Sequence, residues 1–212
     1  MPKRKDRSSV IVNGYAERWI RQGFPWVYPK ERQSGPTKPG VWVRVKNAKG
    51  DVLASGLTDD GWIAVRLFRF DSGSLGGDWL HHLLDRALAY RRDVVPQEST
   101  AYRLVHGEND GMPGIRMDWW SHYVTVVLDS PSLAPLLPGI CDWLESRLSP
   151  RGIYLCYRLD ARDKPSADSL VPAPGLLRGH PSTSEVTVRE HDLLFLVRPN
   201  DGPDVGLYND MR

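Results

Sequence analysis

The sequence predicts two folded parts of different class: a β-rich part that forms a small barrel, then an α+β part with a mixed sheet and helices. Short runs of β-branched and aromatic residues, bounded by glycine and aspartate turns, fill the first seventy residues. Longer helical patterns of leucine alternate with apolar strands in the remainder. A polar, glycine-rich stretch at 71–77 separates the two parts.

The first part is expected to hold one short helix and several strands. The helix is predicted at 16–22, with Trp19 and Ile20 on its inner side, and it is broken by the Gly-Phe-Pro-Trp sequence that follows. The clearest strand patterns lie at 41–45 and 62–68. Turns are predicted between them at 47–51 and 59–61.

The second part begins with a leucine-rich helix. Asp78 can cap this helix, which is predicted to run to about Arg92 and to bridge the two parts. A second helix is predicted at 133–148, where Pro138 fits only an early turn. The predicted strands of this part are 101–105, 123–128, 153–159, 185–189 and 193–197.

These patterns divide the chain into four segments. Residues 1–8 are expected to be a disordered basic tail, residues 9–71 the β-rich domain, residues 72–93 a linker and bridging helix, and residues 94–212 the α+β domain.

The composition, 41% hydrophobic and 25% charged, is that of an ordinary globular protein. No run of residues approaches the length of a membrane-spanning helix, and a cytoplasmic location is expected. The two cysteines, Cys141 and Cys156, are interpreted as core thiols, because neither lies beside an activating base in the sequence.

The net charge of +2 hides a strong asymmetry. Residues 1–70 carry 14 lysines and arginines against 6 acidic residues, whereas residues 71–212 carry 14 against 20. A basic module beside an acidic one favours a polyanionic partner for the first, although a solvated surface would give the same count.

Three segments resemble one known family. The segment Gly14–Trp26, reading GYAERWIRQGFPW, is similar to the opening of the PUA domain in large-subunit rRNA methyltransferases of the 5-methylcytosine type. The segment Ala101–Asp118, reading AYRLVHGENDGMPGIRMD, resembles the hairpin of that family's central domain. The segment Gly206–Arg212, reading GLYNDMR, resembles the heptad that precedes its catalytic Rossmann domain.

The resemblance implies an enzyme that uses S-adenosylmethionine, binds large-subunit rRNA and often forms homodimers. Tyr208, Asp210 and Arg212 would border the cofactor in the complete enzyme. Because the sequence stops at Arg212, we expect the Rossmann domain to be absent, and with it the glycine-rich loop and the catalytic cysteine. This chain alone is then expected to bind no cofactor tightly and to transfer no methyl group.

RNA binding is expected in the first part. Looped RNA is recognised by base stacking on aromatic or guanidinium planes and by neutralisation of phosphates. Trp42 and Trp62 lie in strand patterns and are interpreted as core residues. The predicted RNA contacts are Arg18, Arg21, Trp26, Lys46 and Arg66.

The central hairpin crowds four acidic or imidazole side chains into thirteen residues: His106, Glu108, Asp110 and Asp118. Their spacing matches no familiar metal site, so turn building is the favoured interpretation and no metal is expected. Two other functions stay open: a stand-alone PUA-type RNA-binding or ribosome-assembly module, and a barrel that only docks another protein.

Overall fold

The structure is a computed structural model, and it describes residues 8–71, 78–158, 171–182 and 185–204. The chain divides into two compact units, Met1–Gly77 and Asp78–Arg212. Most of the predicted basic tail, residues 1–7, lies outside the described residues.

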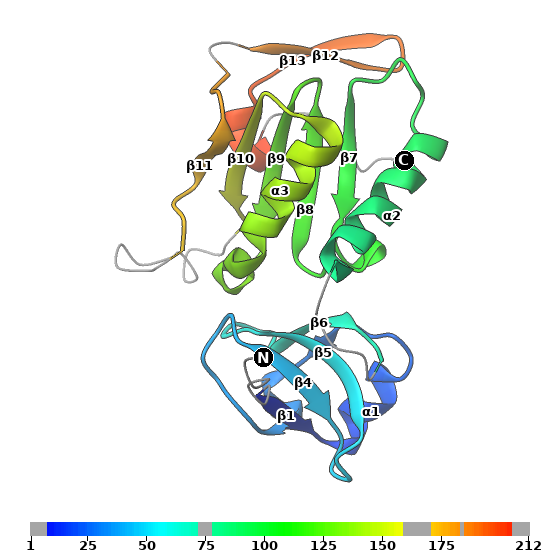
Figure 1. Cartoon of the computed structure of the whole chain (residues 1–212), viewed down its shortest axis with the longest axis vertical. Helices are drawn as coiled ribbons and strands as arrows, with labels where there is room; N and C mark the ends of the chain where they lie inside the picture. Colours follow the sequence, from blue (N-terminus) through cyan, green and yellow to red (C-terminus); the bar gives the residue numbers. More distant parts are fainter. Residues whose placement is uncertain (1–7, 72–77, 159–170, 183–184, 205–212) are drawn as a thin grey trace, which may run out of the picture. The chain divides into compact units, whose positions relative to one another are not determined.

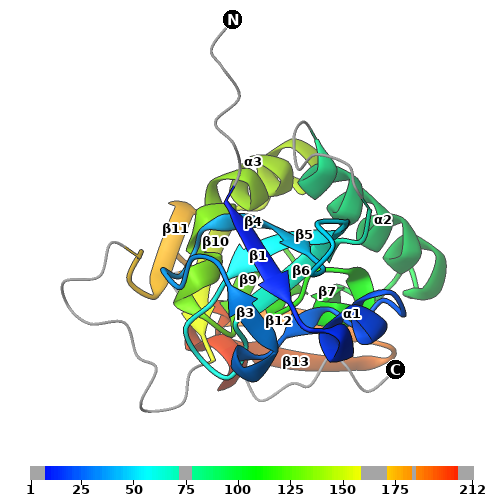
Figure 2. The same cartoon turned by 90° about the horizontal axis from the view of Figure 1, so that it is seen from below.

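The first unit is built on one six-stranded sheet that curls into a nearly closed barrel (Figures 1 and 2). Its strand order is β2-β6-β5-β4-β1-β3, in which β1 and β4 are parallel and all other neighbours antiparallel. The strands are β1 (Ser9–Val12), β2 (Trp26–Val27), β3 (Arg32–Ser34), β4 (Trp42–Lys46), β5 (Val52–Thr58) and β6 (Val65–Arg69). The helices are α1 (Gly14–Ile20) and η1 (Pro29–Glu31).

Alternating apolar residues fill this barrel. Val10, Val12, Val43 and Val45 are all buried, and Ile20 of α1 packs into the same core. A register shift between Ser55 and Gly56 bends β5 where it pairs with β6. A side chain at Gly56 would collide with the backbone carbonyl of Arg66, so this close approach requires glycine.

One predicted strand begins later than expected. The pattern predicted a strand from residue 62, but β6 begins at Val65, and the Trp62 side chain is 81% exposed. The turn at 59–61 extends further than its sequence suggested, because the Asp59 amide donates to the Ala64 carbonyl across the loop. The core interpretation of Trp62 is therefore wrong, whereas Trp42 is half-buried with its ring 5.9 Å from that of Phe68.

The second unit contains a mixed sheet, as predicted; it has five strands in the order β11-β10-β9-β8-β7, of which β8 and β11 were not predicted. Strands β9 and β10 are parallel and the other pairs antiparallel. The strands are β7 (Ala101–His106), β8 (Ile115–Trp120), β9 (Tyr123–Leu128), β10 (Gly152–Tyr157) and β11 (Gly175–Gly179). A separate hairpin pairs β12 (Val186–Glu190) with β13 (Leu193–Val197).

Both faces of this sheet are covered. Figure 1 shows α2 (Trp79–Val94) and α3 (Leu137–Leu148) in front of the sheet, and η4 (Pro199–Asp204) behind it. Double coverage explains why the consecutive residues Val124 to Leu128 of β9 are all buried.

The two long helices pack against each other within the second unit. The helix that was expected to bridge the two parts, α2, is grouped with this unit and also contacts β7. The predicted helix 133–148 is divided into η3 (Pro131–Leu136) and α3, which places Pro138 in the first turn of α3 as expected. The short 3-10 helix η2 (Gly107–Asp110) follows β7. Among the described residues, no helix is long and apolar enough to cross a membrane.

Candidate nucleic-acid interface

The turn after α1 brings aromatic side chains together on the surface of the first unit. The Asn13 side chain caps the start of the helix by accepting from the Ala16 amide at 3.0 Å. At the other end, Gly23 adopts a φ of 87°, a left-handed conformation that favours glycine. The Gly23 amide donates to the Ile20 carbonyl at 2.9 Å, and the Phe24 amide to the Trp19 carbonyl at 3.0 Å. This pair of bonds is a Schellman motif, which folds Phe24 back beside Trp19.

The turn thereby assembles five aromatic rings into one group, which we call the aromatic band: Tyr15, Trp19, Phe24, Trp26 and Tyr28. Successive ring centroids lie 5.5–6.4 Å apart along the band, with edge-to-face or tilted geometry. Tyr15 is 60% exposed and Trp19 39% exposed. Exposed rings in such a series offer faces on which unpaired bases can stack.

Two of the predicted cations lie on the helix that carries this band. The Arg18 guanidinium carbon is 5.9 Å from the centroid of the Trp19 ring, and the Arg18 side chain is exposed. The side chain of Arg21 is 58% exposed and forms an ion pair with Glu17 at 2.7 Å. Glu17 also accepts from Asn47 at 3.0 Å, and these hydrogen bonds lower the pKa of its carboxyl group. Arg18 is thus the less engaged of the two cations.

The other three predicted contacts have different surroundings. Trp26 is half-buried inside the aromatic band, and Lys46 is half-buried at the end of β4. Arg66 is buried, and its Nε donates to Asp59 at 2.7 Å. The guanidinium of Arg66 is therefore engaged inside the unit, so we do not retain Arg66 in the surface proposed below. The structure brings Arg18 and Trp26 to the band, whereas Arg66, opposite Trp26 in the β2–β6 pair, is held by Asp59.

Sequence reasoning missed most of the band. Trp19 was assigned to the inner side of the helix, but Ala16 and Ile20 fill that side and Trp19 points outward. Tyr15, Phe24 and Tyr28 were not singled out. A usable signal was present, because five aromatic residues fall between positions 15 and 28 beside Arg18 and Arg21.

The remaining candidate residues, in the central hairpin and at Cys141, have structural roles. In the central hairpin, Asp110 pairs with Arg91 and Asp118 with Arg103, at 2.7 and 2.9 Å. Within the described part of the chain, no group of three or more His, Cys, Asp or Glu residues could hold a metal ion. Burial raises the pKa of the Cys141 thiol to about 11, which keeps it protonated at neutral pH. The expected cofactor contacts, Tyr208, Asp210 and Arg212, lie outside the described residues.

Comparison with known sequences identifies the domain that carries this surface. Residues 10–70 match the family model of a PUA-like domain. The chain is 29% identical to ribosomal RNA large subunit methyltransferase I of Alteromonas mediterranea, over 97% of this chain and 52% of that protein. It is a homologue of that methyltransferase. The protein of the same name from Shewanella frigidimarina is 28% identical, over 92% of this chain and 50% of that protein. The chain thus spans about half the length of these curated relatives.

Two solved structures with the same fold are described as putative methyltransferases. A putative SAM-dependent methyltransferase from Streptococcus mutans superposes with a TM-score of 0.78 at 16% identity, covering 96% of this chain and 52% of that chain. A putative methyltransferase complexed with SAH gives a TM-score of 0.77 at 15% identity, covering 94% and 50%. At these identities the likeness shows only that this chain and the two solved structures share a fold.

Proposed function

We propose that this chain carries the RNA-recognition part of an S-adenosylmethionine-dependent methyltransferase that acts on large-subunit ribosomal RNA. The observation that carries the proposal is the aromatic band, which lies beside Arg18 in a domain that matches the PUA-like family. The names of the homologues supply the reaction class and the ribosomal substrate. A cytoplasmic location goes with such a substrate.

The proposed binding surface combines two kinds of contact. Arg18, Arg21 and Lys46 neutralise phosphates, and the exposed faces of Tyr15 and Trp19 stack unpaired bases. Each stacked base contributes about 1–3 kcal/mol, and each neutralised phosphate adds about 0.7 to the slope of log affinity against log salt on single strands. The excess of basic over acidic residues in positions 1–70 favours the approach of RNA to this unit.

In the proposed reaction, the methyl donor is S-adenosylmethionine. When bound to the complete enzyme, it supplies an electrophilic methyl group attached to its sulfonium sulfur. We assign none of the described residues to that cofactor. The proposed target atom is C5 of a cytosine, following the resemblance of the Gly14–Trp26 and Ala101–Asp118 segments to enzymes of that type.

A direct test of the reaction uses a strain of the source organism from which the gene has been deleted. Mass spectrometry of digested large-subunit rRNA should show the loss of one 5-methylcytosine, and the intact gene on a plasmid should restore it. Loss of a methyl group at another atom would contradict the cytosine assignment alone. An unchanged set of methylated nucleotides would contradict the methyltransferase proposal.

The alternative function is a stand-alone RNA-binding module. The reading frame downstream of the Arg212 codon distinguishes it from the methyltransferase. A continuing frame that encodes a glycine-rich loop after a strand, followed by a cysteine motif, agrees with the methyltransferase. A stop codon directly after Arg212 would favour the stand-alone module.

A further inference from the structure

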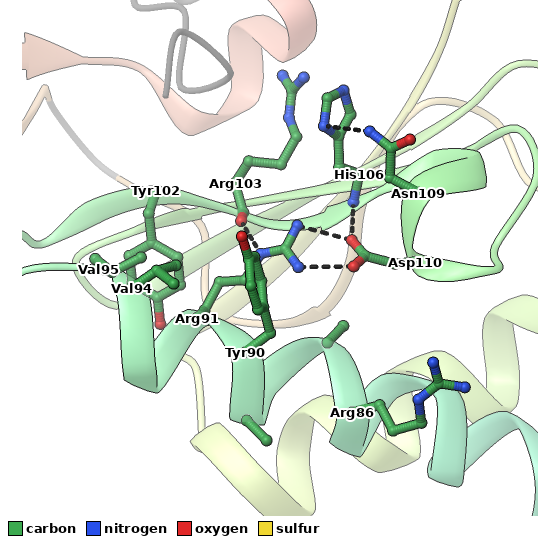
Figure 3. Close-up of a pocket in the computed structure, with 12 residues that line it drawn as sticks. Arg86, Tyr90, Arg91, Val94, Val95, Tyr102, Arg103, His106, Asn109 and Asp110 are labelled. Carbon is green, nitrogen blue, oxygen red and sulfur yellow. Dashed lines mark hydrogen bonds and ion pairs between the residues drawn. The ribbon is translucent and has the colours of Figure 1, made fainter.

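The second unit contains a cavity of about 760 Å³ between the C-terminal half of α2, strand β7 and η2 (Figure 3). Pockets of 300–1,000 Å³ are typical of small-molecule and cofactor sites. The walls of this cavity combine aromatic, aliphatic and cationic side chains. None of its lining residues belongs to the aromatic band of the first unit.

The floor of the cavity is a fixed ion pair. Both terminal nitrogens of Arg91 donate to the two carboxylate oxygens of Asp110 at 2.7 Å, and the two side chains are only 9% and 11% exposed. Arg91 Nε also donates to the Arg103 carbonyl at 3.0 Å, and Asp110 accepts from the His106 amide at 2.6 Å. Figure 3 shows these bonds converging between α2 and β7. The floor is therefore rigid before any ligand enters, and its charges compensate each other.

A stacking surface lies directly on this floor. The Tyr90 ring covers the Arg91 guanidinium, whose carbon is 5.2 Å from the ring centroid, and yet Tyr90 is 59% exposed. Val94, one helical turn further on, extends the apolar surface and is also exposed. Tyr102 of β7 lines the same cavity, and burial raises the pKa of its hydroxyl group. The Arg91 guanidinium lies against one face of the Tyr90 ring, and the ring remains exposed to solvent. Such a ring is suited to stacking against a planar ligand.

An uncompensated positive charge lies at one end of this surface. Arg86 precedes Tyr90 by one helical turn, so Arg86, Tyr90 and Val94 share a face of α2. Arg86 lines the cavity, is exposed and forms no ion pair among the described residues. Asn109 of η2 also lines the cavity and offers both a donor and an acceptor, and its amide approaches the His106 ring at 3.4 Å. The ligand that fits has a planar ring with polar edges and carries an anionic group.

We propose that this cavity receives one unstacked nucleotide of a single-stranded RNA, with its base on Tyr90, its phosphate at Arg86 and its base edge towards Asn109. The proposal rests on the RNA-binding function proposed above and adds a second contact, in the second unit. A nucleotide in RNA and a free nucleoside monophosphate share this chemistry, so the experiment must separate the two.

The test measures binding of a fluorescent single-stranded oligoribonucleotide to the full chain and to three variants. Tyr90→Ala should weaken binding about tenfold, because it removes one stacked base, and Tyr90→Phe should stay within about twofold of the parent. Arg86→Gln should weaken binding about threefold and lower the salt slope. Arg151→Gln, at an exposed position of the same unit outside the cavity, is the matched control and should change nothing. Equal affinities for Tyr90→Ala and the parent would overturn the proposal.

Cross-linking locates the contact independently of affinity. An oligonucleotide containing 4-thiouridine should cross-link, on irradiation, to peptides from α2 or β7 as well as to the peptide that carries the aromatic band. Cross-links to the band alone would overturn the cavity proposal and leave the proposed function standing, whereas no cross-links and no binding would overturn both. Free cytidine and uridine monophosphates should bind at least tenfold more weakly than the oligonucleotide, since they lack the contacts to the first unit. Equal binding of the free nucleotides would show that RNA is not the ligand of the cavity.

Discussion

Arg18 lies over the ring of its neighbour Trp19, with 5.9 Å between the guanidinium carbon and the ring centroid. The pair presents a positive charge and an aromatic surface at one place on α1, and the Schellman turn at Gly23 adds Phe24 beside it. A base stacks on an aromatic face, and its phosphate is neutralised by a cation. Arg18 and Trp19 are therefore the residues on which the proposed RNA contact depends most.

Replacement of Trp19 by alanine should weaken binding of single-stranded RNA by about 1–3 kcal/mol, because one stacking surface is removed. The Trp19→Phe variant should retain most of the affinity. Trp62→Ala is the matched control, since Trp62 is more exposed than Trp19 and lies in a turn outside the aromatic band. Fluorescence anisotropy with a labelled oligonucleotide measures all three. An effect of Trp62→Ala as large as that of Trp19→Ala would contradict the assignment of the band.

Neutralisation of Arg18 and of Arg21 should have unequal effects. Arg18→Gln removes a cation that has no acidic partner among the described residues, and it should lower the salt slope by about 0.7. Arg21→Gln removes a cation whose Nε and one terminal nitrogen already donate to Glu17, so fewer of its donors are available to a phosphate. We expect a smaller loss of affinity at low salt for Arg21→Gln than for Arg18→Gln. Identical losses would indicate that the Glu17 ion pair does not hold Arg21 in solution.

Arg66→Met should affect stability and leave RNA binding intact. Removal of one partner of a buried ion pair costs about 3–5 kcal/mol, because Asp59 is left as a buried, uncompensated charge. The double variant Asp59→Leu/Arg66→Met should recover at least half of that loss. Urea unfolding measures the free energies, and anisotropy at low temperature measures RNA affinity of the folded protein. Unchanged stability with weaker RNA binding would restore Arg66 to the binding surface.

The contact between α2 and α3 should depend on pH through Asp85. Its carboxylate accepts from Arg147 Nε at 2.9 Å and from Trp143 Nε1 at 2.8 Å, and these bonds lower its pKa to about 2. Because the pKa is lower in the folded than in the unfolded state, the stabilisation is complete above about pH 4 and disappears as the pH falls through about 2. Because more than a third of the Asp85 side chain is exposed and its ion pair is screened by water, Asp85→Ala should reduce the free energy of unfolding at pH 7 by only about 1 kcal/mol.

Urea unfolding of the parent and of Asp85→Ala between pH 7 and pH 2 measures this dependence. The difference between the two proteins should be constant above pH 4 and should narrow below it. Asp142→Ala is the control, because Asp142 is 62% exposed where it pairs with Arg178, and its replacement should change stability by at most about 0.5 kcal/mol. A difference that stays constant down to pH 2 would contradict the role of the Asp85 carboxylate.

Local patterns in the sequence predicted the elements that depend on local residues. The leucine spacing of α2, the β-branched strands β4 and β9 and the early turn at Pro138 all follow from short windows of sequence. Trp62 was misplaced because the length of its turn is set by a hydrogen bond between Asp59 and Ala64, which composition does not reveal. This error lies where a single backbone contact decides which way a side chain points.

The candidate site was only partly predictable for a related reason. The net charge of residues 1–70 indicated RNA binding but could not separate Arg18 from Arg66, because six residues lie between Arg66 and its buried partner Asp59. Helical spacing allowed either Trp19 or Ala16 to face inward. Because Ile20 packs into the barrel core, Ala16 faces inward with it and Trp19 faces outward. The cavity beside Tyr90 was not foreseen at all, since it needs α2 and β7 to be placed together.

The most direct test of the central claim is the salt dependence of RNA binding by the full chain. A labelled single-stranded oligoribonucleotide is titrated by anisotropy at several salt concentrations between about 50 and 200 mM. The account predicts measurable binding whose log affinity falls linearly with log salt, with a slope of about −2 for three phosphate contacts, and Trp19→Ala should lower the affinity without changing that slope. Binding that is absent or independent of salt, or a Trp19→Ala variant with parental affinity, would contradict it.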